Sequence, residues 1–257
     1  MTTNPGTEYG DDVYRRLIDI GIALSAERDH NRLMELILLE AKDLCHADGG
    51  TLYLRDEDEL HFAIMRTDSL DIAMGGTTGK AIPFPPLRLH DPKTGEANHG
   101  NVATHVALSG ESVNVNDAYA TERFDFSGTK KFDEGTGFRS KSFLTVPLKN
   151  HDGDVIGVLQ LLNAQDPESG EVTAFPETIQ PLVEALTSQA AVALDNQHLI
   201  EAQRKLLDSF IELIASAIDA KSPYTGGHCQ RVPELSKMLA RAACDSDDGP
   251  FADFNLN

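Results

Sequence analysis

Hydrophobic and polar positions follow two different periods along this chain, and each period predicts a different kind of element. Apolar residues recur at helical spacing over residues 11–27 and again after Asp29, which predicts two helices with Asp29 as the N-cap of the second. The segment Ala47–Gly50 is expected to end the second helix. From Thr51 the period falls to two, which predicts strands.

Two hairpins stand out in this second pattern. Alternating residues in Thr51–Arg55 and Leu60–Ile64 flank an acidic turn, and Phe143–Leu148 and Val155–Leu162 flank the turn at Asp152-Gly153. An Asp-Gly turn is a strong hairpin indicator. The strand Val155–Leu162 is apolar on both faces, so both faces of the predicted antiparallel sheet must be covered.

The segment between the hairpins is long and rich in glycine and proline. It predicts a loop over 67–100 with a short strand near Leu87–Leu89, then a short helix at Asn101–Leu108 and a short strand at Ser112–Val115. Loops of this length are uncommon unless they serve a function. We therefore expect segment 67–140 to cover one face of the sheet, with a ligand cavity beneath it.

One long helix is predicted from Glu177 to Ala220, and the alternative is two helices broken near 196–198. Its apolar residues lie near a seven-residue seam, which indicates a partner helix. We therefore expect a homodimer formed through the helices at 11–27 and 177–220. Residues 222–227 break the long helix, and a further helix is predicted over 228–243.

Together these elements predict an α+β fold. Its centre is an antiparallel sheet of about six strands, with helices 11–47 and the start of the long helix on one face and loops on the other. The long C-terminal helix leads into a short, truncated all-α segment.

Composition narrows the classes of partner. Apolar residues make up 40% of the 257 positions, enough for a core, but the net charge is -19. Such a surface repels nucleic-acid phosphates and anionic lipid headgroups, so we expect neither as a partner. No apolar run reaches the length of about 20 residues that crosses a bilayer, and the three cysteines show no disulfide or metal spacing. These features predict a cytoplasmic protein without membrane insertion.

Part of the chain resembles a known sensor family. The stretches Val115–Tyr119, Arg123-Phe124, Thr136–Ser142, Phe143–Leu148 and Val155–Asn163 are similar to GAF domains, especially those of cyclic-nucleotide phosphodiesterases and bacterial cyclases. The resemblance covers roughly residues 10–200 and implies a GAF fold. It also implies a small-molecule ligand without a bound cofactor.

The resemblance implies ligand contacts at Asn116, Asp117, Phe124 and Thr136, the positions that help line the pocket of nucleotide-binding members. Asp117 can equally cap the short helical turn that follows it.

Further candidates come from the residues themselves. Phe124, Phe132 and Phe138 can stack on a purine, although core packing explains them equally well. His105 lies on the short predicted helix over the pocket, where a packed or surface histidine is the simpler interpretation.

The pattern departs from nucleotide-binding GAF domains at one motif. In those members an asparagine is followed by lysine, and a later phenylalanine is followed by an Asp-Glu pair. Here Asn163 matches the asparagine, but Ala164 replaces the lysine and Phe175 is followed by Pro176 rather than by the acidic pair. The run Lys131–Glu134 does not supply that motif. The ligand therefore stays open between cyclic AMP, cyclic GMP and another small molecule, and the alternative is a ligand-free dimerisation scaffold.

A second resemblance lies over 217–232, which is similar to the opening of HD-GYP domains, metal-dependent phosphodiesterases that hydrolyse cyclic di-GMP. It implies that His228 is the first histidine of a divalent iron or manganese site. The family's His-Asp dyad and Gly-Tyr-Pro segment do not occur in this chain, and one histidine cannot hold the metals. We therefore expect an intact parent enzyme to hydrolyse a cyclic dinucleotide and this chain to be inactive.

The predicted domain organisation has four parts. They are a disordered tail at 1–10, a GAF sensor domain at 11–198, a signalling-helix linker at 199–221 and the truncated start of an HD-GYP domain at 222–257.

Overall fold

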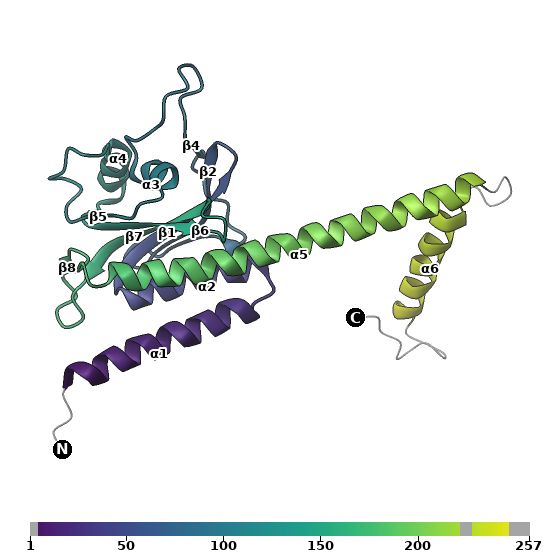
Figure 1. The fold of residues 1–257 in the computed structure, drawn as a ribbon, viewed down its shortest axis with the longest axis horizontal. Coiled ribbons are helices and arrows are strands. Elements are labelled where there is room, and N and C mark those ends of the chain that lie inside the picture. The colour runs from purple at the N-terminus through teal and green to yellow at the C-terminus, as the bar shows by residue number, and fades with distance from the viewer. Residues whose placement is uncertain (1–4, 222–227, 247–257) are drawn as a thin grey trace. The chain divides into compact units, whose positions relative to one another are not determined.

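The computed structural model describes residues 5–221 and 228–246, with side chains described over 15–218 and 231–246. The chain divides into two compact units, one ending at Gln197 and the other beginning at His198. The sheet and its two covering layers all belong to the first unit (Figure 1). Residues 222–227, where a break in the helix is predicted, lie outside the described residues.

One eight-stranded sheet forms the centre of the first unit, with the order β3-β2-β1-β7-β6-β5, while β4 pairs with β2 and β8 with β7. The described pairings between these strands are antiparallel. The strands are β1 (Ala47–Asp56), β2 (Glu59–Thr67), β3 (Ile72–Gly75), β4 (Leu87–Arg88), β5 (Val113–Val115), β6 (Phe143–Lys149), β7 (Val155–Gln165) and β8 (Val172–Thr173).

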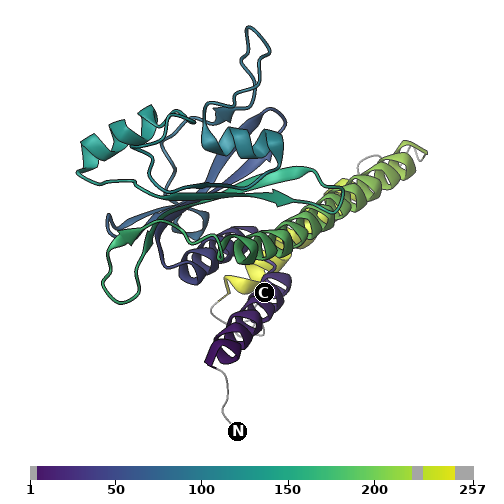
Figure 2. The same cartoon turned by 60° about the vertical axis from the view of Figure 1, so that its left-hand side comes forward.

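Helices cover both faces of the sheet. In the first unit, α1, α2 and the first part of α5 lie on one face, and α3 and α4 lie on the other (Figures 1 and 2). The helices are α1 (Pro5–Ala26), α2 (His30–Leu44), α3 (Val102–Ser109), α4 (Ser127–Thr136), α5 (Gln180–Lys221) and α6 (His228–Cys244), with a 3-10 turn η1 (Gly76–Thr78).

Both predicted hairpins are present. Asp56 pairs with Glu59 at the end of the β1–β2 hairpin, and the β6–β7 hairpin turns at Gly153, whose φ of 86° suits a residue without a side chain. Six strands form the main path, as predicted, and the short strands β4 and β8 extend it. The α+β architecture with a long C-terminal helix is thereby confirmed.

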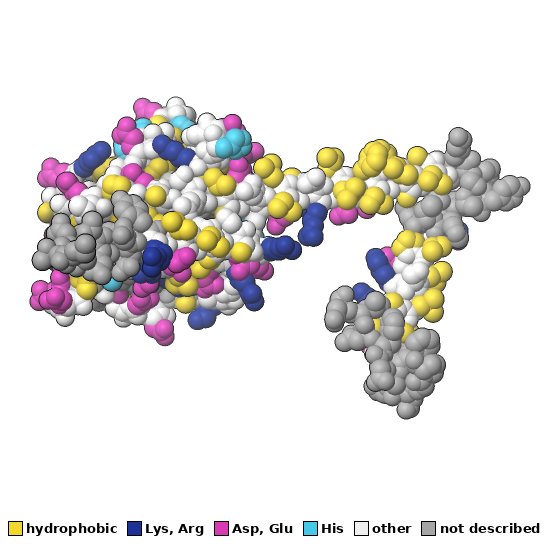
Figure 3. All heavy atoms as spheres, turned by 60° about the horizontal axis from the view of Figure 1, so that its bottom comes forward, with side chains coloured by type: hydrophobic (Ala, Val, Ile, Leu, Met, Phe, Trp, Pro, Cys, Tyr) yellow, Lys and Arg dark blue, Asp and Glu magenta, His cyan; other side chains and the backbone are white. Residues whose placement is uncertain are grey.

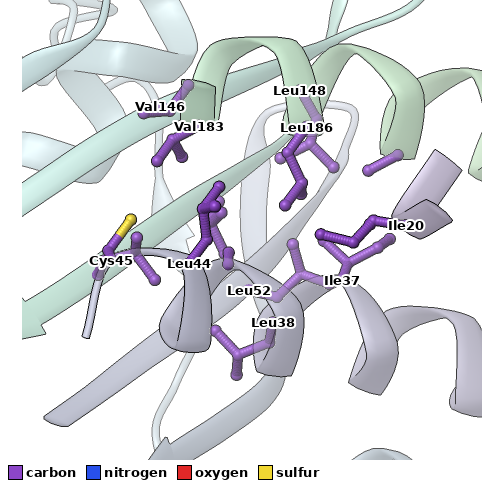
Figure 4. Close-up of a cluster of buried hydrophobic side chains, with 14 of the residues drawn as sticks. Ile20, Ile37, Leu38, Leu44, Cys45, Leu52, Val146, Leu148, Val183 and Leu186 are labelled. Atoms are coloured by element: carbon purple, nitrogen blue, oxygen red, sulfur yellow. The ribbon is translucent and has the colours of Figure 1, made fainter. Parts of the chain in front are cut away.

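Alternation along the strands sends neighbouring residues to different cores. Leu52, Leu159 and Leu161 lie in the core beneath α1, α2 and α5, whereas Tyr53 and Val158 lie in the core beneath α3 and α4. Figure 4 shows the first core, in which side chains from the sheet meet others from all three helices. A strand that is apolar on both faces is thus buried on both faces, as its pattern predicts.

The second helix begins as predicted but ends earlier. The carboxylate of Asp29 accepts a hydrogen bond from the backbone N–H of Arg32 at 2.9 Å, which makes Asp29 the N-cap. Ala47–Gly50 are the first residues of β1 rather than a helix end. Glycine is needed there for close packing, because a Cβ on Gly49 would lie 2.9 Å from the carbonyl oxygen of Arg66.

Cys45 lies in the core beneath the helices, as Figure 4 shows. Burial raises the pKa of its thiol to about 12, so the thiol stays protonated at neutral pH. Cys45 forms no disulfide bond.

Helix α5 is continuous over 42 residues, so the alternative of two shorter helices is wrong. Its residues Val183, Leu186 and Ala190 are buried in the first unit. Large apolar side chains further along the helix are exposed (Figure 3), among them Leu206, Leu207, Phe210, Ile211, Leu213, Ile214 and Ile218.

Several short elements differ from the predictions. The strand β3 lies in the predicted loop over 67–100, and neither α4 nor β8 was predicted as an element. Strands of four and two residues and a helix with two glycines leave almost no periodic pattern. The tail predicted at 1–10 is helical from Pro5, because proline is tolerated at the first position of a helix. No helix among the described residues is both long enough and apolar enough to cross a membrane.

Candidate functional site

A cavity of about 310 Å³ lies in the first unit, between the sheet and the segments that cover its α3 and α4 face. This volume is at the lower end of the range of about 300–1,000 Å³ for small-molecule pockets. We call it the lid cavity. It is lined by Gly50, Thr51, Tyr53, Phe62, Met65, Thr67, Phe84, Pro85, Leu87, Asn101, Val102, Asp125, Phe126, Gly128, Thr129, Phe132, Ser140, Phe143, Gln160 and Leu162.

The floor of the lid cavity carries a short chain of neutral polar groups. The Tyr53 hydroxyl donates to Gln160 Oε1 at 3.4 Å, and Gln160 Nε2 donates to Thr145 Oγ1 at 3.2 Å. Burial raises the pKa of Tyr53, so its hydroxyl keeps its proton. The floor therefore presents hydrogen-bonding groups without charge, fixed on strands β1, β6 and β7.

Aromatic rings form a wall from the floor to the covering segments. Ring centroids are 4.8 Å apart for Tyr53 and Phe62, 5.6 Å for Phe62 and Phe84, and 6.5 Å for Phe84 and Phe132. The first two rings belong to the sheet, Phe84 to the loop before β4 and Phe132 to α4. The separations between the rings are typical of packed aromatic pairs. A planar ligand could pack against the faces and edges of these rings in the same way.

A buried carboxylate holds α4 in place over the lid cavity. Asp133 accepts hydrogen bonds from the Tyr119 hydroxyl at 2.6 Å and from the backbone N–H and hydroxyl of Ser140, both at 2.8 Å. The Arg139 guanidinium lies 4.2 Å from the centroid of the Tyr119 ring. Because Ser140 also lines the cavity, Asp133 ties the covering helix to a residue of the cavity wall.

Asn163 fixes the loop before β6 in a similar way. Its Oδ1 accepts from the backbone N–H of Lys141 at 2.7 Å, and its Nδ2 donates to the carbonyl of Arg139 at 2.8 Å. The asparagine that matches the motif of nucleotide-binding members therefore has a structural role in this chain.

None of the six predicted ligand-binding residues lines the lid cavity. Asn116, Asp117 and Phe124 instead border a separate, open depression on the first unit. The Asp117 carboxylate accepts from the backbone N–H of Tyr119 at 2.8 Å and so stabilises the turn at 118–120, whereas the short helix that the sequence allowed it to cap is not formed. The turn that follows β5 carries these residues away from the cavity.

The remaining predicted contacts are explained by local structure. Phe124 is buried and packs against His105, with ring centroids 5.2 Å apart. Thr136 is exposed in the last turn of α4, where its hydroxyl donates to the carbonyl of Phe132 at 2.9 Å, and Phe138 is half-buried outside the cavity. Ligand contact by these six residues stays a prediction that the geometry does not support.

His105 has an environment that disfavours its charged form. Burial lowers its pKa, and the positive charges of His99 and Arg123 lower it further. Its Nδ1 lies 3.0 Å from Nδ1 of His99, within hydrogen-bond distance. The His105 ring packs at the edge of the second core, where it contacts Phe124.

Metal ligands do not gather in the part of the chain that the structure describes, where no group of three or more His, Cys, Asp or Glu side chains is placed to hold an ion. His228 is the first residue of α6, and its side chain lies outside the described residues.

Of the residues that line the lid cavity, sequence reasoning named Phe132, as a ring that can stack on a purine, and missed the others. Gln160 carries a usable indication, because it is a polar residue within an otherwise apolar stretch of β7. Phe62 occupies an alternating position of β2, and Phe84 lies in a proline-rich loop, so neither differs from ordinary packing in the sequence alone.

Comparison with known proteins identifies the fold. The GAF domain of Acinetobacter phosphoenolpyruvate-protein phosphotransferase shares it with a TM-score of 0.51 and 18% identity, and the match covers 78% of this chain and 99% of that one. The corresponding domain from Coxiella burnetii matches with a TM-score of 0.54 and 14% identity over 74% of this chain and 96% of that one. Free methionine-R-sulfoxide reductase from Neisseria meningitidis matches with a TM-score of 0.51 and 17% identity over 78% of this chain and 96% of that one. At these identities the likeness shows the fold alone.

Two curated relatives match a shorter part of the chain. A dual 3′,5′-cyclic-AMP and -GMP phosphodiesterase 11A from Takifugu rubripes is 36% identical over 104 residues, and a dual 3′,5′-cyclic-AMP and -GMP phosphodiesterase 11 from Drosophila melanogaster is 38% identical over 100 residues. These matches cover 40% and 39% of this chain, but only 11% and 6% of the relatives. The family model for the GAF domain matches residues 29–194, more than half of the sequence. The chain therefore belongs to the GAF domain family.

Proposed function

We propose that this chain is a regulatory module in which a small molecule binds in the lid cavity and changes the packing of α1 and α5. The observation that supports this function over a ligand-free scaffold is the cavity itself. A scaffold would be expected to fill its interior with side chains, whereas here Tyr53 and Gln160 present hydrogen-bonding groups to an open volume of about 310 Å³.

The sheet offers a short route from the cavity to the long helix. Gln160 lines the cavity, while its neighbours Leu159 and Leu161 point to the opposite face and lie in one core with Val183 and Leu186 of α5. A shift of β7 on ligand binding would therefore repack the contact with α5. Such a shift has an effect only if the ligand binds the two packing states with different affinity.

Cyclic AMP and cyclic GMP are the first ligands to test, because the two curated relatives are named for acting on both nucleotides. We expect calorimetric titration of the chain to give micromolar binding that Gln160→Leu abolishes and that Thr136→Ala, an exposed control outside the cavity, leaves unchanged. Binding that survives Gln160→Leu and is lost in Thr136→Ala would place the ligand elsewhere. If no small molecule binds the folded protein, the scaffold is the better interpretation.

We also propose that the module is a homodimer through the helices at 11–27 and 177–220. Ile18 and Ile22 of α1 and Val192 of α5 are exposed and border one groove of the first unit. Sedimentation equilibrium is expected to show a dimer that Ile22→Glu weakens by at least about tenfold, since a charge would be buried in the interface. Leu39→Glu, at an exposed position of α2 outside this groove, is the matched control.

The output domain of the proposal is an HD-GYP phosphodiesterase that starts within 222–257, after a GAF domain at 11–198 and a signalling helix at 199–221. The similarity of residues 217–232 to that family supports it. His228 alone cannot hold a divalent metal, so we expect this chain to release no product from cyclic di-GMP with iron or manganese added. Metal-dependent turnover by this chain would contradict the proposal. The module is proposed to act in the cytoplasm.

A further inference from the structure

The charged group that lines the lid cavity is negative. Among its lining residues Asp125 is the single charged side chain, and no lysine, arginine or histidine is present. Asp125 is exposed, and its carboxylate accepts a hydrogen bond from the backbone N–H of Ser127 at 2.8 Å. Hydrogen bonds from the side chain and the backbone of Ser127, together with the positive charge of Lys130, lower its pKa. The cavity therefore carries a negative charge at neutral pH.

Nearby cations are held by other partners. The Arg139 guanidinium lies over the Tyr119 ring, and Arg66 pairs with Glu35 and donates to the carbonyl of Met74 at 2.8 Å. Neither cation lines the cavity, and nor does Lys130, whose charge acts on Asp125 and whose Nζ lies 5.3 Å from the centroid of the Tyr119 ring. The start of α4 would also attract an anion, but the Asp125 carboxylate already accepts a hydrogen bond from its first residue.

The other walls favour a planar group that is neutral or positive. The faces of the rings of Tyr53, Phe62, Phe84 and Phe132 carry partial negative charge, which attracts cations as well as stacking with flat rings. The Gln160 amide adds a hydrogen-bonding group that needs no counterion. An aromatic wall beside one carboxylate suits an aromatic amine or an uncharged heteroaromatic ring.

We propose that the lid cavity selects its ligand by charge: it binds an aromatic group that is cationic or neutral and disfavours an anionic one. This inference rests on the proposed small-molecule function and narrows the class of ligand. For a cyclic nucleotide it means that the base can enter the cavity, whereas the phosphate loses affinity if it enters with the base.

Three small probes of nearly equal shape test the proposal: benzamidine, benzamide and benzoate, which carry positive, zero and negative charge. Their dissociation constants are measured on the whole chain from NMR shifts of the backbone amides of Thr129, Ser140 and Gln160, which line the cavity. We expect affinity to fall in that order, with benzamidine about tenfold tighter than benzoate, because attraction to the Asp125 carboxylate, although weakened by solvent at this exposed position, becomes repulsion when the sign of the probe's charge is reversed. Equal or tighter binding of benzoate overturns the proposal.

Two variants separate the local charge from the overall charge of the protein. Asp125→Asn keeps an oxygen that accepts from Ser127 and is expected to bring the ratio of benzamidine to benzoate affinity close to one. Glu122→Gln removes the same charge at an exposed position outside the cavity and is expected to leave the ratio unchanged. If Asp125→Asn leaves the ratio unchanged while all three probes bind, charge selection is wrong and the small-molecule function stands. If no probe shifts these amides, both proposals fail.

Discussion

Replacing Asp133 by alanine tests how α4 is held over the lid cavity. The Asp133 side chain is 3% exposed and accepts three hydrogen bonds, from the Tyr119 hydroxyl and from the backbone N–H and hydroxyl of Ser140. The substitution removes all three acceptor contacts at once. The backbone N–H of Ser140, which is buried, is then left without its partner.

The expected cost follows from the hydrogen bonds that are lost. A hydrogen bond to a charged group contributes about 1.5–3 kcal/mol, and part of this returns when exposed donors bind water. We expect Asp133→Ala to lower the free energy of unfolding by about 3 kcal/mol. Asp133→Asn should cost about 1 kcal/mol, because the amide keeps one acceptor oxygen and can donate to the Ser140 hydroxyl.

Urea unfolding followed by circular dichroism gives these differences, and amide hydrogen exchange shows whether α4 opens first. Glu134→Ala is the matched control, since Glu134 is the exposed neighbour on the same helix and should change stability by less than about 0.5 kcal/mol. A cost below about 1 kcal/mol for Asp133→Ala, or equal costs for the alanine and asparagine variants, would refute the assigned role.

Three further outcomes can be measured by thermal unfolding. Asp29→Ala should cost about 1 kcal/mol, because it removes the N-cap of α2, and Asp29→Ser should restore most of the loss. Leu161→Ala should cost about 2–5 kcal/mol at a fully buried site, whereas Leu206→Ala, at a side chain that is 71% exposed, should cost far less unless a partner covers it. The lowered pKa of His105, caused by burial and by His99, means that stability is retained above the ordinary histidine pKa of about 6.5 and is lost as pH falls toward the folded-state pKa. His105→Gln should therefore show a weaker loss between pH 7.5 and 5.5, and an unchanged pH profile would contradict this assignment.

Local patterns were enough to predict most of the architecture. The Asp152-Gly153 turn and the capping of α2 by Asp29 depend on residues that are adjacent in sequence, so their geometry can be inferred without the fold. The apolar pattern of Val155–Leu162 likewise required cover on both faces, and helices provide it on both. Very short strands and the glycine-rich α4 carried too little pattern to be found.

The candidate site was decided by tertiary structure. Residues such as Tyr53, Phe84, Phe132 and Gln160 come from β1, a loop, α4 and β7, and they meet because the sheet order places β1 beside β7 and the chain folds back over both. The six predicted ligand contacts, four of them suggested by family resemblance, lie outside the cavity. For Asn116, Asp117 and Phe124 the reason is the segment after β5, which places them at another surface. Sequence by itself determined the elements and the family, because periodicity and turn chemistry are local. The lining of the cavity and its charge depend on contacts between segments that are up to about a hundred residues apart in the sequence. Only the folded chain brings these segments together.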